Sequence, residues 1–173
     1  QSLRGRLRDD RRGRGGSVNG KIVAGVLVLT ALAAGALLYW QQIYAYYTPI
    51  EAASAAADIR LTPLEGAPEA LLTAGFEGID AGSSPLRFRS CFTTPTALAT
   101  LTETFRTYEN PTPLVAPGWF DCFDAERIGK DLETGAAVAF LSEAEIHPGV
   151  DRVVAVYPDG RAFGWHPLSG TLE

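Results

Sequence analysis

A run of nineteen uncharged residues near the start of the chain, Ile22 to Trp40, most strongly limits what this sequence can fold into. As a helix rising about 1.5 Å per residue, it would span roughly 28 Å, close to the hydrocarbon thickness of a bilayer. A core helix of a soluble protein carries a polar stripe, whereas here Thr30 alone interrupts the apolar surface. Because only a helix satisfies a single backbone segment inside lipid, the run predicts a transmembrane anchor.

The net charge changes sign across this run. Residues 1–40 hold seven basic and two acidic side chains, while residues 41–173 hold eight basic and eighteen acidic ones. By the positive-inside rule, we expect a cytoplasmic N-terminus and a C-terminal part on the far side of the membrane. An aromatic belt marks the far interface and completes an anchor over residues 18–47: Tyr39, Trp40, Tyr44, Tyr46 and Tyr47.

The N-terminal region leaves two alternatives open. A cleaved signal peptide would end at Ala36, because Ala34-Gly35-Ala36 has the small-x-small form of a cleavage site. The apolar surface that continues to Trp40 favours an uncleaved anchor instead. We expect residues 1–17 to be a disordered basic tail, or sequence upstream of a natural start at Val18. The tail has no interleaved aromatic residues, so we expect no binding of nucleic acid.

After the anchor the sequence changes character twice. Residues 48–57 are small and alanine-rich, which predicts a linker, and residues 58–173 predict one globular domain. Apolar and alternating runs predict strands at 59–64, 70–73, 86–93, 136–141, 153–157 and 161–166. We expect the unbroken run 136–141 to be a central strand, and the last two strands to form a hairpin over 158–160.

Two helices are predicted between these strands. The first begins with Thr94 as its N-cap and ends before Asn110, and its apolar face repeats at helical spacing: Leu98, Leu101, Phe105 and Tyr108. The second is capped by Asp121 or Asp124 and ends at Gly135. The order of strands and helices predicts a small α+β domain with a mainly antiparallel sheet and two helices.

The two cysteines are the sharpest chemical feature of the sequence. Cys91 lies on a predicted strand and Cys122 near the start of a predicted helix. Two cysteines in an exported domain favour one disulfide. The alternative is a redox pair, since a thiol in the first turn of a helix has a lowered pKa. The spacing is not that of a Cys-x-x-Cys motif, which favours the structural bridge.

A candidate interaction surface combines an aromatic cluster with two arginines on a predicted strand: Trp119, Phe120, Phe123, Arg87 and Arg89. The alternatives are a core position for the aromatic residues and a solvated sheet face for the arginines. His147 and His166 match no compact metal motif, and we expect neither a metal nor a cofactor.

Small residues within the apolar run suggest a packing face for another membrane helix. Ala24, Ala31 and Gly35 lie near one helical face and include a small-xxx-small pair.

Several blocks of the sequence carry a family resemblance: Val18-Asn19-Gly20-Lys21, Tyr44-Ala45-Tyr46-Tyr47, Gly78-Ile79-Asp80, Trp119-Phe120-Asp121-Cys122-Phe123-Asp124 and Pro158-Asp159-Gly160-Arg161. Together they resemble a family of single-pass inner-membrane proteins of Rhodobacter-group alphaproteobacteria that carry a domain of unknown function. The resemblance implies a periplasmic domain and no established activity. Proteins of this kind are sometimes labelled histidine kinase, but this chain has two histidines and no Gly-rich ATP lid.

These features favour a non-enzymatic protein that is held in the inner membrane and acts in the periplasm. We expect its partners to be the lipid bilayer and another membrane or periplasmic protein, with which it serves as an interaction, assembly or accessory-subunit module. The alternative is a thiol-redox or ligand-sensing domain that uses Cys91 and Cys122.

Overall fold

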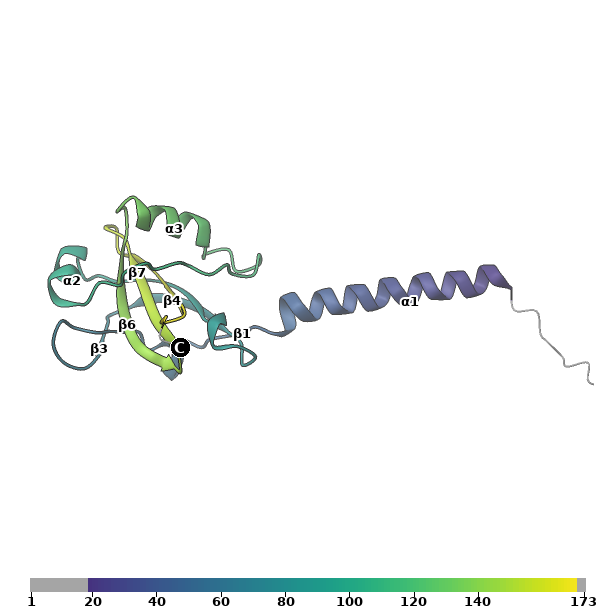
Figure 1. The fold of residues 1–173 in the computed structure, drawn as a ribbon, viewed down its shortest axis with the longest axis horizontal. Coiled ribbons are helices and arrows are strands. Elements are labelled where there is room, and N and C mark those ends of the chain that lie inside the picture. Colours follow the sequence, from purple (N-terminus) through teal and green to yellow (C-terminus); the bar gives the residue numbers. More distant parts are fainter. Residues whose placement is uncertain (1–18, 171–173) are drawn as a thin grey trace, which may run out of the picture. The chain divides into compact units, whose positions relative to one another are not determined.

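The computed structural model describes residues 19–170, and contacts divide the chain after Trp40 into a helical segment and a folded domain (Figure 1). The basic tail expected over residues 1–17 lies outside the described residues. The folded domain begins at Gln41, earlier in the chain than the composition suggested.

The apolar run forms the helix α1, Gly20–Trp40, which continues as a π-helical turn over Gln41–Ala45. Together they make a helix of 26 residues that is long and apolar enough to cross a membrane. Thr30 donates its hydroxyl proton to the carbonyl of Val26 at 2.8 Å, so this polar group is satisfied within the helix. Within the described part of the chain, no residue of α1 is buried.

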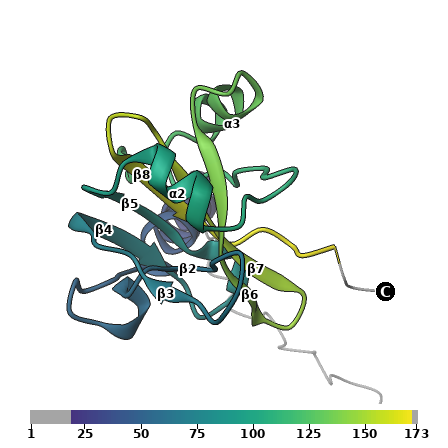
Figure 2. The same ribbon diagram turned by 90° about the vertical axis from the view of Figure 1, so that its left-hand side faces the viewer.

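The domain is built on a six-stranded sheet in which every neighbouring pair is antiparallel. The strands are β1 (Thr48–Pro49), β4 (Ala74–Asp80), β5 (Arg89–Thr93), β6 (Val138–His147), β7 (Val150–Val156) and β8 (Arg161–Trp165). Their order is β1-β4-β5-β8-β7-β6, and Figure 2 shows β4, β5 and β8 side by side. The strands β2 (Arg60–Leu61) and β3 (Glu69–Ala70) pair separately. With the helices α2 (Leu98–Thr104) and α3 (Ala125–Glu133), they confirm the predicted α+β class.

The core lies on both faces of the sheet and centres on β7, all seven residues of which are buried. Because side chains alternate along a strand, β7 contributes to two apolar clusters. We call the first cluster the α2 face; it receives Val154 from β7 and Leu101 from α2. The second, the α3 face, receives Val153 from β7, Trp165 from β8 and Ile128 from α3. The sheet is therefore covered on both sides.

The first helix of the domain is shorter than the apolar spacing predicted. It ends at Thr104, and the chain then runs extended to Tyr108, whose amide donates to the carbonyl of Ala139 in β6 at 2.8 Å. This tertiary pairing overrides the helical periodicity. The predicted N-cap was also wrong, because the cap position is Ala97 and not Thr94.

β6 was predicted to be central, but it is an edge strand of the sheet. Its outer side is nevertheless covered, because the amide of Leu141 donates to the carbonyl of Arg106 at 2.9 Å. The amide of Thr62 donates in turn to the carbonyl of Leu141, also at 2.9 Å. The apolar run 136–141 is therefore explained by an edge strand whose outer side is covered by the segments around Thr62 and Arg106.

Two strands were missed by the sequence analysis. β1 lies inside the segment expected to be a linker, and Thr48 in it pairs with Asp80 of β4. β4 contains two glycines, which hide its apolar pattern. A Cβ added at Gly78 would lie 2.8 Å from the ring of Phe76, so this glycine lets the ring lie across the strand.

The hairpin between β7 and β8 confirms the predicted turn over residues 158–160. Gly160 has a φ of +86°, and a Cβ there would lie 2.6 Å from the carbonyl oxygen of Thr94. The Asp159 carboxylate accepts a hydrogen bond from the amide of Arg161 at 3.1 Å. The turn therefore needs glycine both for its backbone conformation and for its close approach to Thr94.

Candidate functional site

Cys91 on β5 and Cys122, just before α3, form a disulfide with Cα atoms 6.3 Å apart, which confirms the predicted pairing. The Cys91 side chain is buried in the α3 face. The two residues are 31 positions apart in sequence, and the loop-entropy estimate for such a bridge is about 3 to 4 kcal/mol of stabilisation. The bridge cross-links the sheet to the irregular segment that precedes α3.

Trp119 contacts the first residues of the folded domain. Its indole N–H donates to the carbonyl of Ile43 at 2.7 Å. Its ring stacks on Tyr44 with centroids 6.2 Å apart and meets the edge of Tyr47 at 6.0 Å. We call Ile43, Tyr44, Tyr47 and Trp119 the junction cluster. It ties the π-helical turn and Tyr47 to the segment that bears the disulfide.

The sequence analysis groups Phe120 and Phe123 with Trp119 on one surface, but both are core residues. They are 9% and 5% exposed, and the ring of Phe123 meets the edge of Trp165 with centroids 6.2 Å apart. The disulfide at Cys122, which lies between them in sequence, holds this segment against the sheet. The candidate interaction surface therefore loses these two residues.

Arg89 is 4% exposed, so neither a solvated sheet face nor a free binding group describes it. Its guanidinium donates to four backbone carbonyls at 2.6–3.1 Å, those of Leu86, Phe88, Leu114 and Val115. Burial lowers the pKa of Arg89 to about 10, and the group remains charged at neutral pH. Arg89 thus fastens the loop around Leu114 to β5.

Arg87 is only half-buried, two residues before Arg89. Its guanidinium carbon lies 5.9 Å from the ring centroid of Tyr46 and 5.4 Å from that of Tyr47. The guanidinium makes no hydrogen bond or ion pair with any residue from 19 to 170. Two hollows of about 390 and 450 Å³ adjoin it. Of the two candidate arginines, Arg87 is the one with donors available to a ligand.

A second buried polar group joins β7 to the end of β8. The Nε of Arg152 donates to Nε2 of His166 at 3.0 Å, and Nδ1 of His166 lies 2.7 Å from the carbonyl oxygen of Pro85. Since a carbonyl only accepts and the arginine only donates, His166 is neutral with its proton on Nδ1. Burial lowers the pKa of His166 to about 3. His166 also stacks on Phe88 of the α2 face, so this histidine has a structural role.

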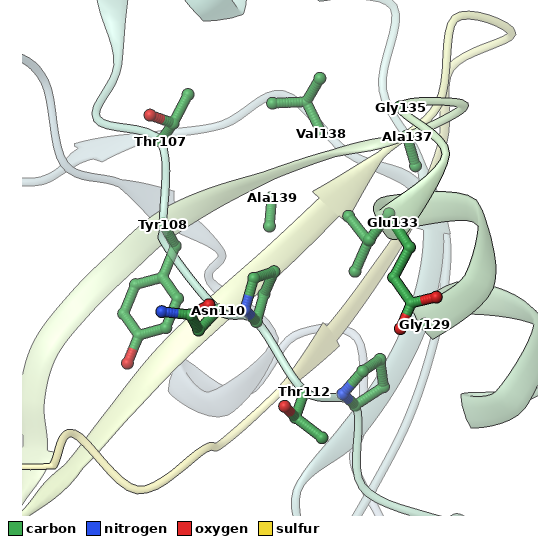
Figure 3. Close-up of a pocket in the computed structure, with 13 residues that line it drawn as sticks. Thr107, Tyr108, Asn110, Thr112, Gly129, Glu133, Gly135, Ala137, Val138 and Ala139 are labelled. Atoms are coloured by element: carbon green, nitrogen blue, oxygen red, sulfur yellow. The ribbon is translucent and has the colours of Figure 1, made fainter.

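A pocket of about 570 Å³ lies between β6, α3 and the loop after Tyr108 (Figure 3). Figure 3 shows Tyr108 and Asn110 on one side of it and Glu133 on the other. The Tyr108 hydroxyl donates to the Asp151 carboxylate at 3.0 Å, and burial together with this bond raises the pKa of Tyr108 to about 12. Tyr108 therefore offers a protonated phenol and not a base at neutral pH. Between residues 19 and 170, no group of three or more His, Cys, Asp or Glu side chains could hold a metal.

The predicted packing face on α1 consists of Ala24, Ala31 and Gly35, all on an exposed helix. A Cβ added at Gly35 would meet no heavy atom of the described residues within 4 Å apart from its chain neighbours and the adjacent helix backbone. Association of this face with another membrane helix stays a prediction.

Sequence reasoning missed the contacts of Trp119 with Tyr44 and Tyr47, which it assigned to an interfacial belt. The available signal was the crowding of five aromatic residues into positions 39–47. The pairing of Arg152 with His166 left no signal in the sequence, since it joins two strands through their register.

Residues 59–173 match a family model described as a family of unknown function (DUF6446). The match includes both cysteines, Trp119 and the two arginines of the candidate surface, but it begins after the junction residues Ile43, Tyr44 and Tyr47. No curated protein and no solved structure matches the chain.

Proposed function

The chain belongs to the family of unknown function DUF6446, and we propose that it is anchored in a bacterial inner membrane and binds another envelope protein. The anchor is α1, the N-terminus lies in the cytoplasm, and the folded domain lies in the periplasm. The protein acts without catalysis, as an interaction or assembly factor or as an accessory subunit of a larger membrane complex.

The observation that carries this proposal is the exposure of α1. Its large apolar side chains have no protein cover among the described residues; Leu27 and Leu29, for example, are 66% and 68% exposed. The 21 residues of α1 form an apolar helix without buried residues, and lipid is the surrounding that suits such a helix. A membrane therefore accounts for the apolar surface of α1.

Charge and covalent chemistry support the orientation. Basic residues predominate before the helix and acidic residues after it, as the positive-inside rule requires of a cytoplasmic N-terminus. The Cys91–Cys122 disulfide fits the oxidising periplasm.

The junction cluster and the disulfide favour an interaction role, because both fix the position of chain segments and neither offers a reactive group. A thiol-redox role is disfavoured by the burial of Cys91. Ligand sensing is the second candidate function, and the pocket lined by Tyr108 and Glu133 supports it.

Membrane topology is tested with a reporter fused after Glu173. An alkaline phosphatase fusion, which is active only in the periplasm, should be active. A green fluorescent protein fusion that is exported by the general export route should not fluoresce. The reverse pattern would exclude the proposed orientation.

The partner is sought by cross-linking mass spectrometry of membranes that contain a tagged copy of the full chain. We expect one stoichiometric envelope protein, and we expect Gly35→Leu to weaken its capture through the α1 packing face. Ala33→Leu, on the opposite side of the helix, is the matched control. Failure to recover any stoichiometric partner would favour the ligand-sensing candidate.

A further inference from the structure

We propose that Arg87 binds the phosphate of a phospholipid headgroup in the bilayer that holds α1. The domain then has a second, non-covalent attachment to the membrane surface beside its helical tether. This inference rests on the proposed function, because it requires α1 to lie in a bilayer.

The length of chain between Trp40 and Tyr46 places Arg87 near the headgroups. The five residues of the π-helical turn advance the chain by only about 7 Å, so Tyr46 lies within about 10 Å of the end of the apolar span. The polar layer of a bilayer is roughly 5 to 8 Å thick on each side. Since Arg87 lies over the ring of Tyr46, the short chain after Trp40 keeps its guanidinium within reach of the lipid phosphates.

The surroundings of Arg87 suit an anion. One adjoining hollow is lined by Gln42, Tyr46, Ser83 and Arg87. The side-chain amide of Gln42 and the hydroxyl of Ser83 can add hydrogen bonds to a bound anion. The other hollow has no carboxylate in its lining either. This is notable in a region, residues 41–173, where acidic side chains outnumber basic ones by ten. The two tyrosine rings hold the guanidinium in place, and its planar fork matches two phosphate oxygens.

The apolar side chains beside Arg87 identify a lipid and not a soluble phosphate as the source of the anion. Val115 lines the same hollow as Arg87 and is 80% exposed. Tyr46, on the other side, is 45% exposed. A lipid headgroup would cover these apolar surfaces while its phosphate meets the guanidinium, whereas a free phosphate would leave them in water.

The test is native mass spectrometry of the full chain in detergent micelles that contain phosphatidylglycerol, an anionic phospholipid. The wild-type chain should retain phospholipid, and Arg87→Gln should lower the retained fraction about fivefold, the effect of one arginine near headgroups. Arg87→Lys keeps the charge without the fork and should fall between the two. Arg127→Gln, which removes an exposed arginine of α3, is the matched control and should retain lipid like the wild type.

Equal retention by Arg87→Gln and the wild type would overturn the inference, and near-UV circular dichroism would verify that the variant is folded. Displacement of the lipid by inorganic phosphate would also overturn it, because the site would then be one for soluble anions. If alkaline carbonate releases the wild-type chain from membranes, the proposed function fails as well. If the chain stays in the membrane and only the variant effect is missing, the inference alone fails.

Discussion

The two faces of the sheet are covered in different ways. On the α2 face, Leu101 of α2 and the side chains around β2 and β3 form a continuous apolar layer. The α3 face is covered in part by a long segment between α2 and α3 without regular structure. Discrete links hold that segment: the disulfide at Cys122, the carbonyl contacts of Arg89, and the indole of Trp165, which donates to the carbonyl of Thr112 at 3.1 Å.

The difference shows how an irregular segment is kept on a small sheet. A helix covers a sheet with side-chain volume, and its backbone groups are satisfied internally. An extended segment leaves its carbonyls unpaired, so it needs donors such as Arg89 and the indole of Trp165. Its stability is therefore concentrated in a few bonds that can be removed one at a time.

Removal of the disulfide should break the α3 face and leave the α2 face intact. The double variant Cys91→Ala, Cys122→Ala should lose about 3 to 4 kcal/mol of unfolding free energy, because the unfolded chain regains the entropy of the open loop. Urea denaturation of the full chain in detergent measures this loss.

Hydrogen exchange of the same variant should show faster exchange in residues 113–124 and unchanged protection in α2. If α2 lost as much protection as residues 113–124, the two faces would unfold as one unit. The proposed difference between the α2 face and the α3 face would then be wrong.

Replacement of Arg89 should release the segment around Leu114 from β5 while the Cys91–Cys122 disulfide stays in place. Arg89→Gln leaves buried carbonyls without a charged donor, and we expect a loss of about 3 kcal/mol in urea denaturation. Arg87→Gln is the matched control, and its stability should stay within about 0.5 kcal/mol of the wild type. Similar losses in both variants would contradict the separation of the two arginines into a structural and a binding residue.

Acid should destabilise the α2 face before the α3 face. The reason is that His166, which stacks on Phe88 of the α2 face and accepts a hydrogen bond from Arg152, titrates. The pKa of His166 is about 3 in the folded chain against an ordinary value of 6.5, so the unfolded chain binds more protons between these values. Stability then falls as the pH is lowered from about 6.5 toward 3, with a loss of about 2 kcal/mol between pH 7 and pH 5. The carbonyls that hold Arg89 do not titrate in this range.

Urea denaturation of the full chain at pH 7 and pH 5 measures this loss. His166→Gln should remove most of the dependence on pH, and His147→Gln, which leaves the pair of Arg152 and His166 in place, should keep it. An unchanged dependence in His166→Gln would show that other groups cause it.

Local patterns predicted the elements that depend on local interactions. The apolar run became α1, Asp124 caps α3 by accepting from the amide of Arg127, and Gly135 ends α3 with a positive φ. The disulfide followed from the presence of two cysteines in a domain expected to be exported. Each of these signals lies in residue type and short spacing.

The elements that were missed depend on partners far away in the sequence. Phe105 and Tyr108 continue the helical spacing of Leu101, yet pairing with β6 extends the chain there. Alternation along β5 indicated one solvated face, but both faces of this strand are covered, and Arg89 is buried with them. The junction cluster joins Trp119 to Ile43, 76 positions earlier, and no periodicity predicts such a contact.

The bond between Trp119 and the carbonyl of Ile43 also has a mechanical consequence. Tension applied through α1 would enter the domain at Ile43 and pass through the indole of Trp119. Three residues later, at Cys122, it would reach β5 through the disulfide. The force would then be shared by strands in the middle of the sheet and would not peel the short β1 from its edge. The sheet would for this reason keep its shape when the chain is pulled at its N-terminal side.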